Sequence, residues 1–241
     1  MSGPVLGVIG GLGPLATANF LELVTKMTQA PSEQDHVDMV VYNFPSIPDR
    51  TGYILGSNLR SPLPGLLWAG RELERQEVSA IAIPCVTAHY FYDDLCRELR
   101  RPIIHDIRLT AQYLKEQGVQ SVGILATEGA VTSGLFTREL LPLGIRPVLP
   151  DKQGQEDVNH LIYRNIKAGI PPEMDKFHTV TKNLRSRGAE VILLGCTELS
   201  VLARDYPLGS GYLDTTRVLA RESILRCGKR LKPEYSDLIS A

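Results

Sequence analysis

The chain has 241 residues, of which 43% are hydrophobic and 22% charged, and its formal net charge is -1 at pH 7. This length suits one large α/β unit or two smaller lobes, with a sizeable core in either case. Lysine and arginine are scattered along the sequence without clusters. We therefore expect neither nucleic acid nor an anionic membrane as the main partner, and a small molecule is favoured.

Targeting and metal signals are missing from the sequence. The N-terminal segment lacks the basic and long apolar regions of a secretory signal, and no apolar run approaches the ~18 residues that span a bilayer. We therefore expect a cytoplasmic protein. The cysteines at positions 85, 96, 196 and 227 have no C-x-x-C spacing, and the five histidines form no recognisable zinc frame. We expect free thiols and no bound metal.

Strand and helix signals alternate from the start of the chain. The segment PVLGVIGG predicts a buried strand and a glycine turn, and a helix follows from Pro14 to about Ala30, since proline suits the first helical position. The Val-rich segment HVDMVVYNF predicts the next strand. It leads into a loop with two prolines, two glycines and Arg50.

The alternation continues through the middle of the chain. We predict an amphipathic helix near 63–76, a strand at 80–84 and a helix at 88–100. A short strand should then end near His105, and the next helix should be closed by Gly118 at the position after its C-cap.

From Gln120 the order of parts repeats, with a strand, a small-residue loop at Thr127 and a helix. The strand end at Gly10 precedes Cys85 by 75 residues, and the one at Thr127 precedes Cys196 by 69. We interpret this as a weak internal duplication.

A final helix is predicted from Asp214 to Leu231, with an aspartate at its N-cap and basic residues in its last turns. The repeated alternation predicts parallel sheets with helices on both faces. In such sheets ligands bind beyond the carboxyl ends of the strands. Both strand-to-helix junctions that carry a cysteine fall there.

These junction cysteines, Cys85 and Cys196, are candidate functional thiols. Amide dipoles at such a junction lower a thiol pKa from its free value of about 8.5, whereas the alternative for a cysteine at a strand end is a small packed side chain. Cys96 and Cys227 lie on predicted helices and fit that alternative.

Each junction cysteine has polar neighbours. Thr87 and His89 follow Cys85, and the pair Thr197 and Glu198 follows the second cysteine. These neighbours can give the two thiols different protonation states. Threonine and glutamate also suit helix N-termini, so helix capping is an open alternative for them, and His89 can equally be a packed core histidine.

The glycine turn formally matches G-x-G-x-x-A, but the second strand ends in Tyr42, Asn43 and Phe44 rather than in the acid that a dinucleotide site requires. The glycines fit better as backbone that approaches a carboxylate at a helix N-terminus. Arg50 in the following loop is either a carboxylate clamp or a solvated surface residue.

Several segments together, GVIGGLGPLAT, NFPSIPDRT, PCVTAHYFYDDL and LLGCTELS, resemble the aspartate/glutamate racemase family of cofactor-independent amino-acid racemases. The resemblance implies an α/β fold with two pseudo-symmetric lobes, each a mostly parallel sheet flanked by helices, and an active site in the cleft between them. It implies one lobe from residues 1–105 and 209–241 and the other from 106–208. Such enzymes are usually homodimers.

The same resemblance implies the chemistry. Cys85 and Cys196 would transfer protons on opposite faces of the substrate Cα, without pyridoxal phosphate or another cofactor. Backbone and hydroxyl donors would come from the loops at Gly11 and Thr127 and from Thr87 and Thr197. Arg50 and Lys167 match the positions that hold the distal carboxylate of aspartate or glutamate, and Glu198 would orient or tune Cys196.

One position departs from the family pattern. Where the family has C-N-T-A-H, with an asparagine that helps to bind the amino-acid head of the substrate, this chain has Val86. An apolar side chain cannot donate that hydrogen bond, which is worth roughly 1.5–3 kcal/mol to a charged group. Weakened binding, a compensating residue and a different substrate all stay open. The alternatives are therefore a related isomerase of the hydantoin racemase type and a catalytically impaired ligand-binding protein.

Overall fold

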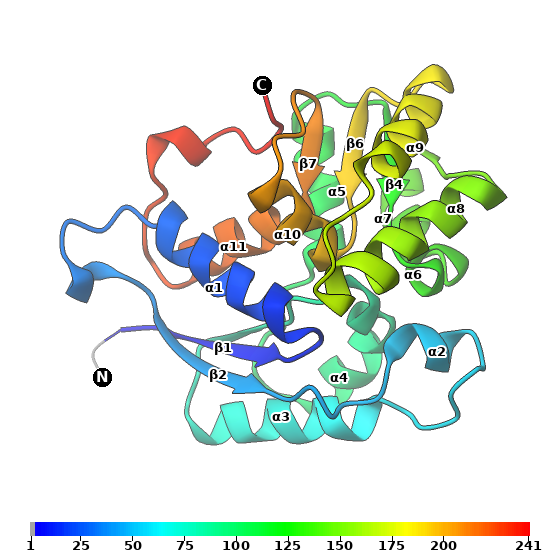
Figure 1. The fold of residues 1–241 in the computed structure, drawn as a ribbon. Coiled ribbons are helices and arrows are strands. Elements are labelled where there is room, and N and C mark those ends of the chain that lie inside the picture. The colour runs from blue at the N-terminus through cyan, green and yellow to red at the C-terminus, as the bar shows by residue number, and fades with distance from the viewer. Residues whose placement is uncertain (1–2) are drawn as a thin grey trace.

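The computed structural model describes residues 3–241. They form two parallel sheets, which lie in two lobes (Figure 1). The first has the order β2-β1-β3, with β1 (Val5–Gly10), β2 (Asp38–Asn43) and β3 (Ala80–Ala82). The second has the order β5-β4-β6-β7, with β4 (Ser121–Leu125), β5 (Arg146–Val148), β6 (Val191–Leu194) and β7 (Tyr212–Asp214). The expected α/β fold with two parallel sheets is confirmed.

The helices surround both sheets. In the first lobe, α3 covers one face of the sheet and α1 lies on the other side (Figure 1). The α-helices of the chain are α1 (Pro14–Met27), α2 (Arg50–Ile54), α3 (Leu63–Arg75), α4 (Tyr92–Glu98), α5 (Asp106–Glu116), α6 (Glu128–Thr132), α7 (Leu135–Leu140), α8 (Lys152–Asn159), α9 (Met174–Ser186), α10 (Thr197–Asp205) and α11 (Thr215–Arg226). Because helices cover both faces, every residue of the central strands β1 and β4 is buried.

Local structure differs from the sequence prediction in several places, and the last helix, α11, ends at Arg226 rather than at the predicted Leu231. The first helix ends at Met27 rather than Ala30, since Thr28 is extended and pairs with Leu231. The strand predicted before His105 is reduced to one bridge between Ile81 and Ile103. The helix predicted at 88–100 is a 3₁₀ helix (Val86–Phe91) followed by α4.

The last strand was missed by the sequence analysis. β7 has three residues and pairs in parallel with β6, so it belongs to the second sheet, after which α11 returns to pack on α1 and α5. Asp214 caps α11 as predicted, accepting a hydrogen bond from the Thr216 amide at 2.8 Å. The lobe boundaries at residues 105 and 209 stay predictions.

One hydrophobic cluster runs through both lobes. It contains Leu6 of the first sheet, Leu193 of the second and Leu219 of α11, each with no exposed surface. Burial of a leucine side chain stabilises a fold by roughly 1.5–3 kcal/mol. A buried polar chain also joins the helices, because Asn19 donates to Ser200 (2.9 Å) and Ser200 donates to Asp214 (2.6 Å). These contacts fix the two sheets relative to each other.

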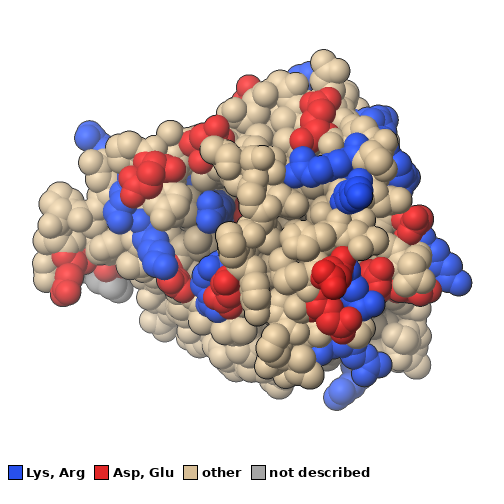
Figure 2. Space-filling view, turned by 45° about the horizontal axis from the view of Figure 1, so that its top comes forward, with Lys and Arg blue, Asp and Glu red and all other residues tan. Residues whose placement is uncertain are grey.

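The surface is mixed in charge on the face shown in Figure 2, where acidic and basic side chains are interspersed. Among residues 3–241, no helix has the length and apolar composition needed to cross a membrane.

Candidate active site

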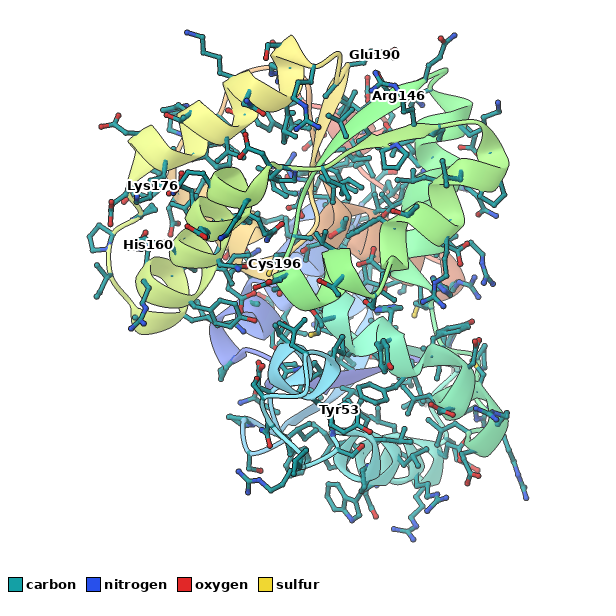
Figure 3. All side chains as sticks on the ribbon, turned by 90° about the vertical axis from the view of Figure 1, so that its right-hand side faces the viewer. Tyr53, Arg146, His160, Lys176, Glu190 and Cys196 are labelled. Carbon is teal, nitrogen blue, oxygen red and sulfur yellow. The ribbon has the colours of Figure 1, made fainter. Side chains whose placement is uncertain are left out.

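The two junction cysteines lie at the carboxyl ends of strands in different sheets. Cys85 follows β3 and precedes a 3₁₀ helix, and Cys196 follows β6 as the N-cap of α10. Their exposed fractions are 5% and 6%, and both line one narrow cavity, which we call the inner cavity. Figure 3 shows Cys196 where the second lobe faces the first. The fold therefore brings the two thiols, 111 residues apart in sequence, to one small space.

Most of the other predicted site residues join the cysteines there. The inner cavity is also lined by Arg50, Val86, Thr87, Thr127, Lys167, Thr197 and Glu198. Gly11 lines an adjoining cavity of about 410 Å³ that opens to solvent, which we call the outer cavity. Leu12, Asp49, Arg50, Lys167 and Glu198 line both cavities, so the outer one leads to the inner one.

Cys196 is held as a thiol by its surroundings. Its sulfur donates to Glu198 Oε2 at 3.0 Å, and the Thr197 hydroxyl donates to the same oxygen at 3.3 Å. Burial raises the pKa of Cys196 well above its ordinary value, the Glu198 carboxylate raises it further, and Lys167 acts in the opposite direction. The Cys196 thiol therefore keeps its proton unless a strong base or a new charge in the cavity lowers its pKa.

Arg50 is buried, with 7% of its surface exposed, and does not lie on the solvated surface. Its guanidinium donates to the main-chain oxygens of Leu12 (2.7 Å) and Pro48 (3.1 Å). Burial lowers its pKa, but the neighbouring Cys85 and Asp49 more than offset this, and the net direction is upward. The guanidinium thus stays charged beside Cys85, where it can hold an anion.

Lys167 lies across the cavity wall on the other lobe. Its ammonium is 3.8 Å from Glu198 Oε1 and 4.7 Å from the ring centre of Tyr163. Burial lowers the pKa of Lys167 while Glu198 and both cysteines raise it, so the net direction is upward. Two permanent cations, one from each lobe, therefore face the space between the thiols.

The threonines also meet across the lobes. The hydroxyls of Thr87 and Thr127 are 2.9 Å apart and share a hydrogen bond. Thr127 is in addition the N-cap of α6, accepting from the Ala130 amide at 3.3 Å. Thr127 therefore caps α6 and lines the cavity as well.

His89 faces the main chain rather than the Cys85 thiol. Its Nδ1 lies 3.1 Å from the Cys85 carbonyl oxygen, and its Nε2 accepts from the Asp106 amide at 3.3 Å. Burial lowers the pKa of His89, which keeps the ring neutral. It is therefore the packed histidine of the two alternatives, and it anchors the Cys85 loop to the start of α5.

Gly11 has a backbone reason to be glycine. Its φ is 89°, and a Cβ there would collide with the main chain of Phe44. Its amide donates to Thr17 Oγ1 at 2.9 Å, so this N–H already has a partner. A direct contact of Gly11 with a substrate stays a prediction. No group of three or more His, Cys, Asp or Glu side chains within residues 3–241 is arranged to hold a metal ion.

A family model for "Asp/Glu/Hydantoin racemase" matches residues 9–223. The chain belongs to this family. Membership places it among the isomerases as a racemase.

Known members resemble the chain over almost its whole length. The broad-specificity amino-acid racemase RacX of Bacillus subtilis is 25% identical over 227 residues, covering 91% of this chain and 96% of the relative. The structure of Picrophilus torridus aspartate racemase has a TM-score of 0.82 at 32% identity, covering 97% of this chain and 98% of that one. A structure described as a putative Asp/Glu racemase from Yersinia pestis has a TM-score of 0.76 at 25% identity, covering 91% and 97%.

This racemase has inner-cavity residues that the sequence analysis did not single out. They are Leu12, Asp49, Thr51 and Tyr163. Asp49 caps α2 by accepting from the Gly52 amide at 2.5 Å, and its place directly before Arg50 was a usable signal. Tyr163 lies in an apolar helical stretch whose pattern suggests packing, so nothing in the sequence distinguished it.

Proposed function

We propose that this racemase interconverts the enantiomers of aspartate or glutamate without pyridoxal phosphate, using Cys85 and Cys196 as the two proton-transfer groups. The observation that carries the proposal is that thiols from two different sheets wall one small cavity. Inversion by deprotonation and reprotonation needs a base on one face of Cα and an acid on the other. Similarity to structures of aspartate racemase supports the choice of substrate.

The surroundings of Cys196 support one assignment of the starting roles. Because Cys196 rests as a thiol bonded to Glu198, a two-base mechanism requires the Cys85 thiolate to remove the Cα proton. The Cys196 thiol then gives its proton to the opposite face of the carbanion. After one turnover Cys85 carries a proton and Cys196 does not, which is the state that accepts the opposite enantiomer.

The charged groups support a dicarboxylic substrate. Arg50 and Lys167 are the cations that line the inner cavity from residues 3–241, and charge-assisted bonds to a carboxylate are about twice as strong as neutral ones. The Thr87, Thr127 and Thr197 hydroxyls supply donors for the negative charge that develops when Cα loses its proton. In a small cavity that excludes water, such donors act more strongly than they do in solvent.

Deuterium exchange tests the proposal. L- and D-aspartate and L- and D-glutamate are incubated in D2O with the wild type and with Cys85→Ser, Cys196→Ser and Cys96→Ser, and Cα deuteration and optical rotation are followed. We expect wild-type and Cys96→Ser protein to racemise one of the amino acids, and both other variants to lose racemisation. Retention of full racemisation by either of those variants refutes the two-cysteine mechanism. If neither amino acid exchanges its α-hydrogen, the assigned substrate is wrong.

A wider substrate range is the second candidate. Leu15, Ile47, Ile166 and Val201 give the outer cavity apolar walls beside the charged residues. A long or apolar side chain that leaves the inner cavity would find space there, in keeping with the broad specificity named for the Bacillus subtilis relative. Exchange assays with methionine, leucine, lysine and hydantoins beside aspartate distinguish the two candidates.

We also propose a cytoplasmic homodimer. Light scattering after gel filtration tests the mass of the particle, and cell fractionation tests its location.

A further inference from the structure

Val86 leaves a gap in the donors of the inner cavity. Its side chain is 2% exposed and belongs to the hydrophobic cluster that runs through both lobes, while one side of it lines the cavity. The side-chain amide that the family pattern places here is therefore missing, and no rotamer of the Val86 side chain can supply a hydrogen bond. A bound amino acid must find a donor from another residue or bind more weakly.

Two buried donors in the same cavity have no partner. Within residues 3–241, Arg50 Nε and the Tyr163 hydroxyl are buried without a hydrogen bond of ordinary geometry, although the Thr51 side chain is a polar neighbour of that hydroxyl, and both residues line the inner cavity. Buried polar groups are nearly always paired, because an unpaired one loses its bonds to water without replacement. Two such donors in one cavity wall indicate that a ligand with acceptor atoms completes them.

Tyr163 is well placed to make this contact. It lies in a π-helical turn, His160–Asn165, a feature that is frequent at functional sites. Its ring supports the Lys167 ammonium, so the hydroxyl and a cation are presented together. Burial raises the pKa of Tyr163 above its ordinary value, so the phenol keeps its proton and can donate it at neutral pH.

We propose that the Tyr163 hydroxyl donates a hydrogen bond to a carboxylate oxygen of the bound amino acid and so replaces the donor that Val86 lacks. The inference rests on the proposed amino-acid substrate, and it makes Tyr163 a binding residue. Because the contact is made to a carboxylate that stays charged throughout the reaction, it stabilises substrate and transition state alike. Its loss should raise KM and leave kcat unchanged.

Tyr163→Phe removes only the hydroxyl. We expect KM for the preferred amino acid to rise by about 10- to 100-fold, as for loss of a bond to a charged group, with kcat within about twofold of wild type. The melting temperature should not fall, since the hydroxyl has no partner in the free protein. Tyr53→Phe is the matched control, because Tyr53 packs on Phe91 and does not line either cavity. It should change neither KM nor kcat.

Val86→Asn supplies the decisive second variant. Restoring an amide donor should recover most of the lost affinity in the Tyr163→Phe background and gain less in the wild type, so the two effects should not be additive. An unchanged KM in Tyr163→Phe, or a fall in its melting temperature without a change in KM, overturns the proposal. Calorimetric titration with aspartate and glutamate makes the same comparison without turnover. Absence of racemisation by the wild type would instead count against the proposed function.

Discussion

Glu198→Gln tests how the second thiol is controlled. The replacement keeps the size of the side chain but removes the negative charge that accepts the Cys196 proton at 3.0 Å. After burial, this carboxylate is the main cause of the raised pKa of Cys196. We therefore expect the pKa of Cys196 to fall in the variant.

The size of the shift follows from the geometry. Two unit charges about 4 Å apart interact by about 4 kcal/mol at an effective dielectric constant of ~20. The nearby Lys167 ammonium and entering water screen the pair and reduce this interaction. The glutamine amide can also donate to a thiolate and so acts in the same direction. A downward shift in the pKa of Cys196 is therefore expected.

The assay is alkylation of Cys196 by iodoacetamide at a series of pH values, with the modified peptide quantified by mass spectrometry. Only the thiolate reacts, so the midpoint of the rate against pH reports the pKa. Glu128→Gln is the control, since that exposed carboxylate accepts from Asn159 and does not line the inner cavity. A midpoint that stays in place or moves upward in Glu198→Gln refutes the assigned role of the carboxylate.

Three further predictions concern stability. Ser200→Ala leaves Asn19 and Asp214 without their shared buried partner and should lower the free energy of unfolding by about 1–3 kcal/mol, measured by urea denaturation. Leu193→Ala opens a cavity in the core and should lower it by about 2–5 kcal/mol in the same assay, with an exposed leucine as control. Burial lowers the pKa of His105 to about 4, below its ordinary 6.5, so the unfolded chain binds the proton first. Stability should be constant above about pH 6.5 and fall toward pH 4, and His105→Asn should reduce that fall.

The sheets were predictable where the strands are continuous apolar runs. β1, β4 and β6 are buried on both faces, and this leaves a clear hydrophobic signal. β7 was not predicted, because its three residues follow a glycine-rich turn and pair only through long-range hydrogen bonds. The segment before His105 was predicted as a strand but forms only one bridge. An apolar pattern does not show how many backbone hydrogen bonds a segment will make with the neighbouring strand.

The site was predictable only in part, for a related reason. The position of Cys85 and Cys196 after strands follows from local pattern, but the proposed role of Lys167 rests on family resemblance alone. Arg50 is held by main-chain carbonyl groups, and such partners leave no mark on the sequence. Tyr163 could not be found from sequence, because the feature that marks it is a buried hydroxyl without a partner, which is a property of the assembled cavity.

The two halves of the site share a frame but differ in their electrostatics. Each cysteine follows a strand, yet the Cys196 sulfur donates to a carboxylate, whereas His89 beside Cys85 bonds only the main chain. In a racemase the kinetic effect of this difference is limited, because the two enantiomers of one amino acid are equal in free energy. Their kcat/KM values must then be equal in the two directions, whatever the pKa values of the thiols. The Glu198 carboxylate can therefore change kcat and KM separately for each enantiomer, but it cannot make the enzyme favour one product at equilibrium.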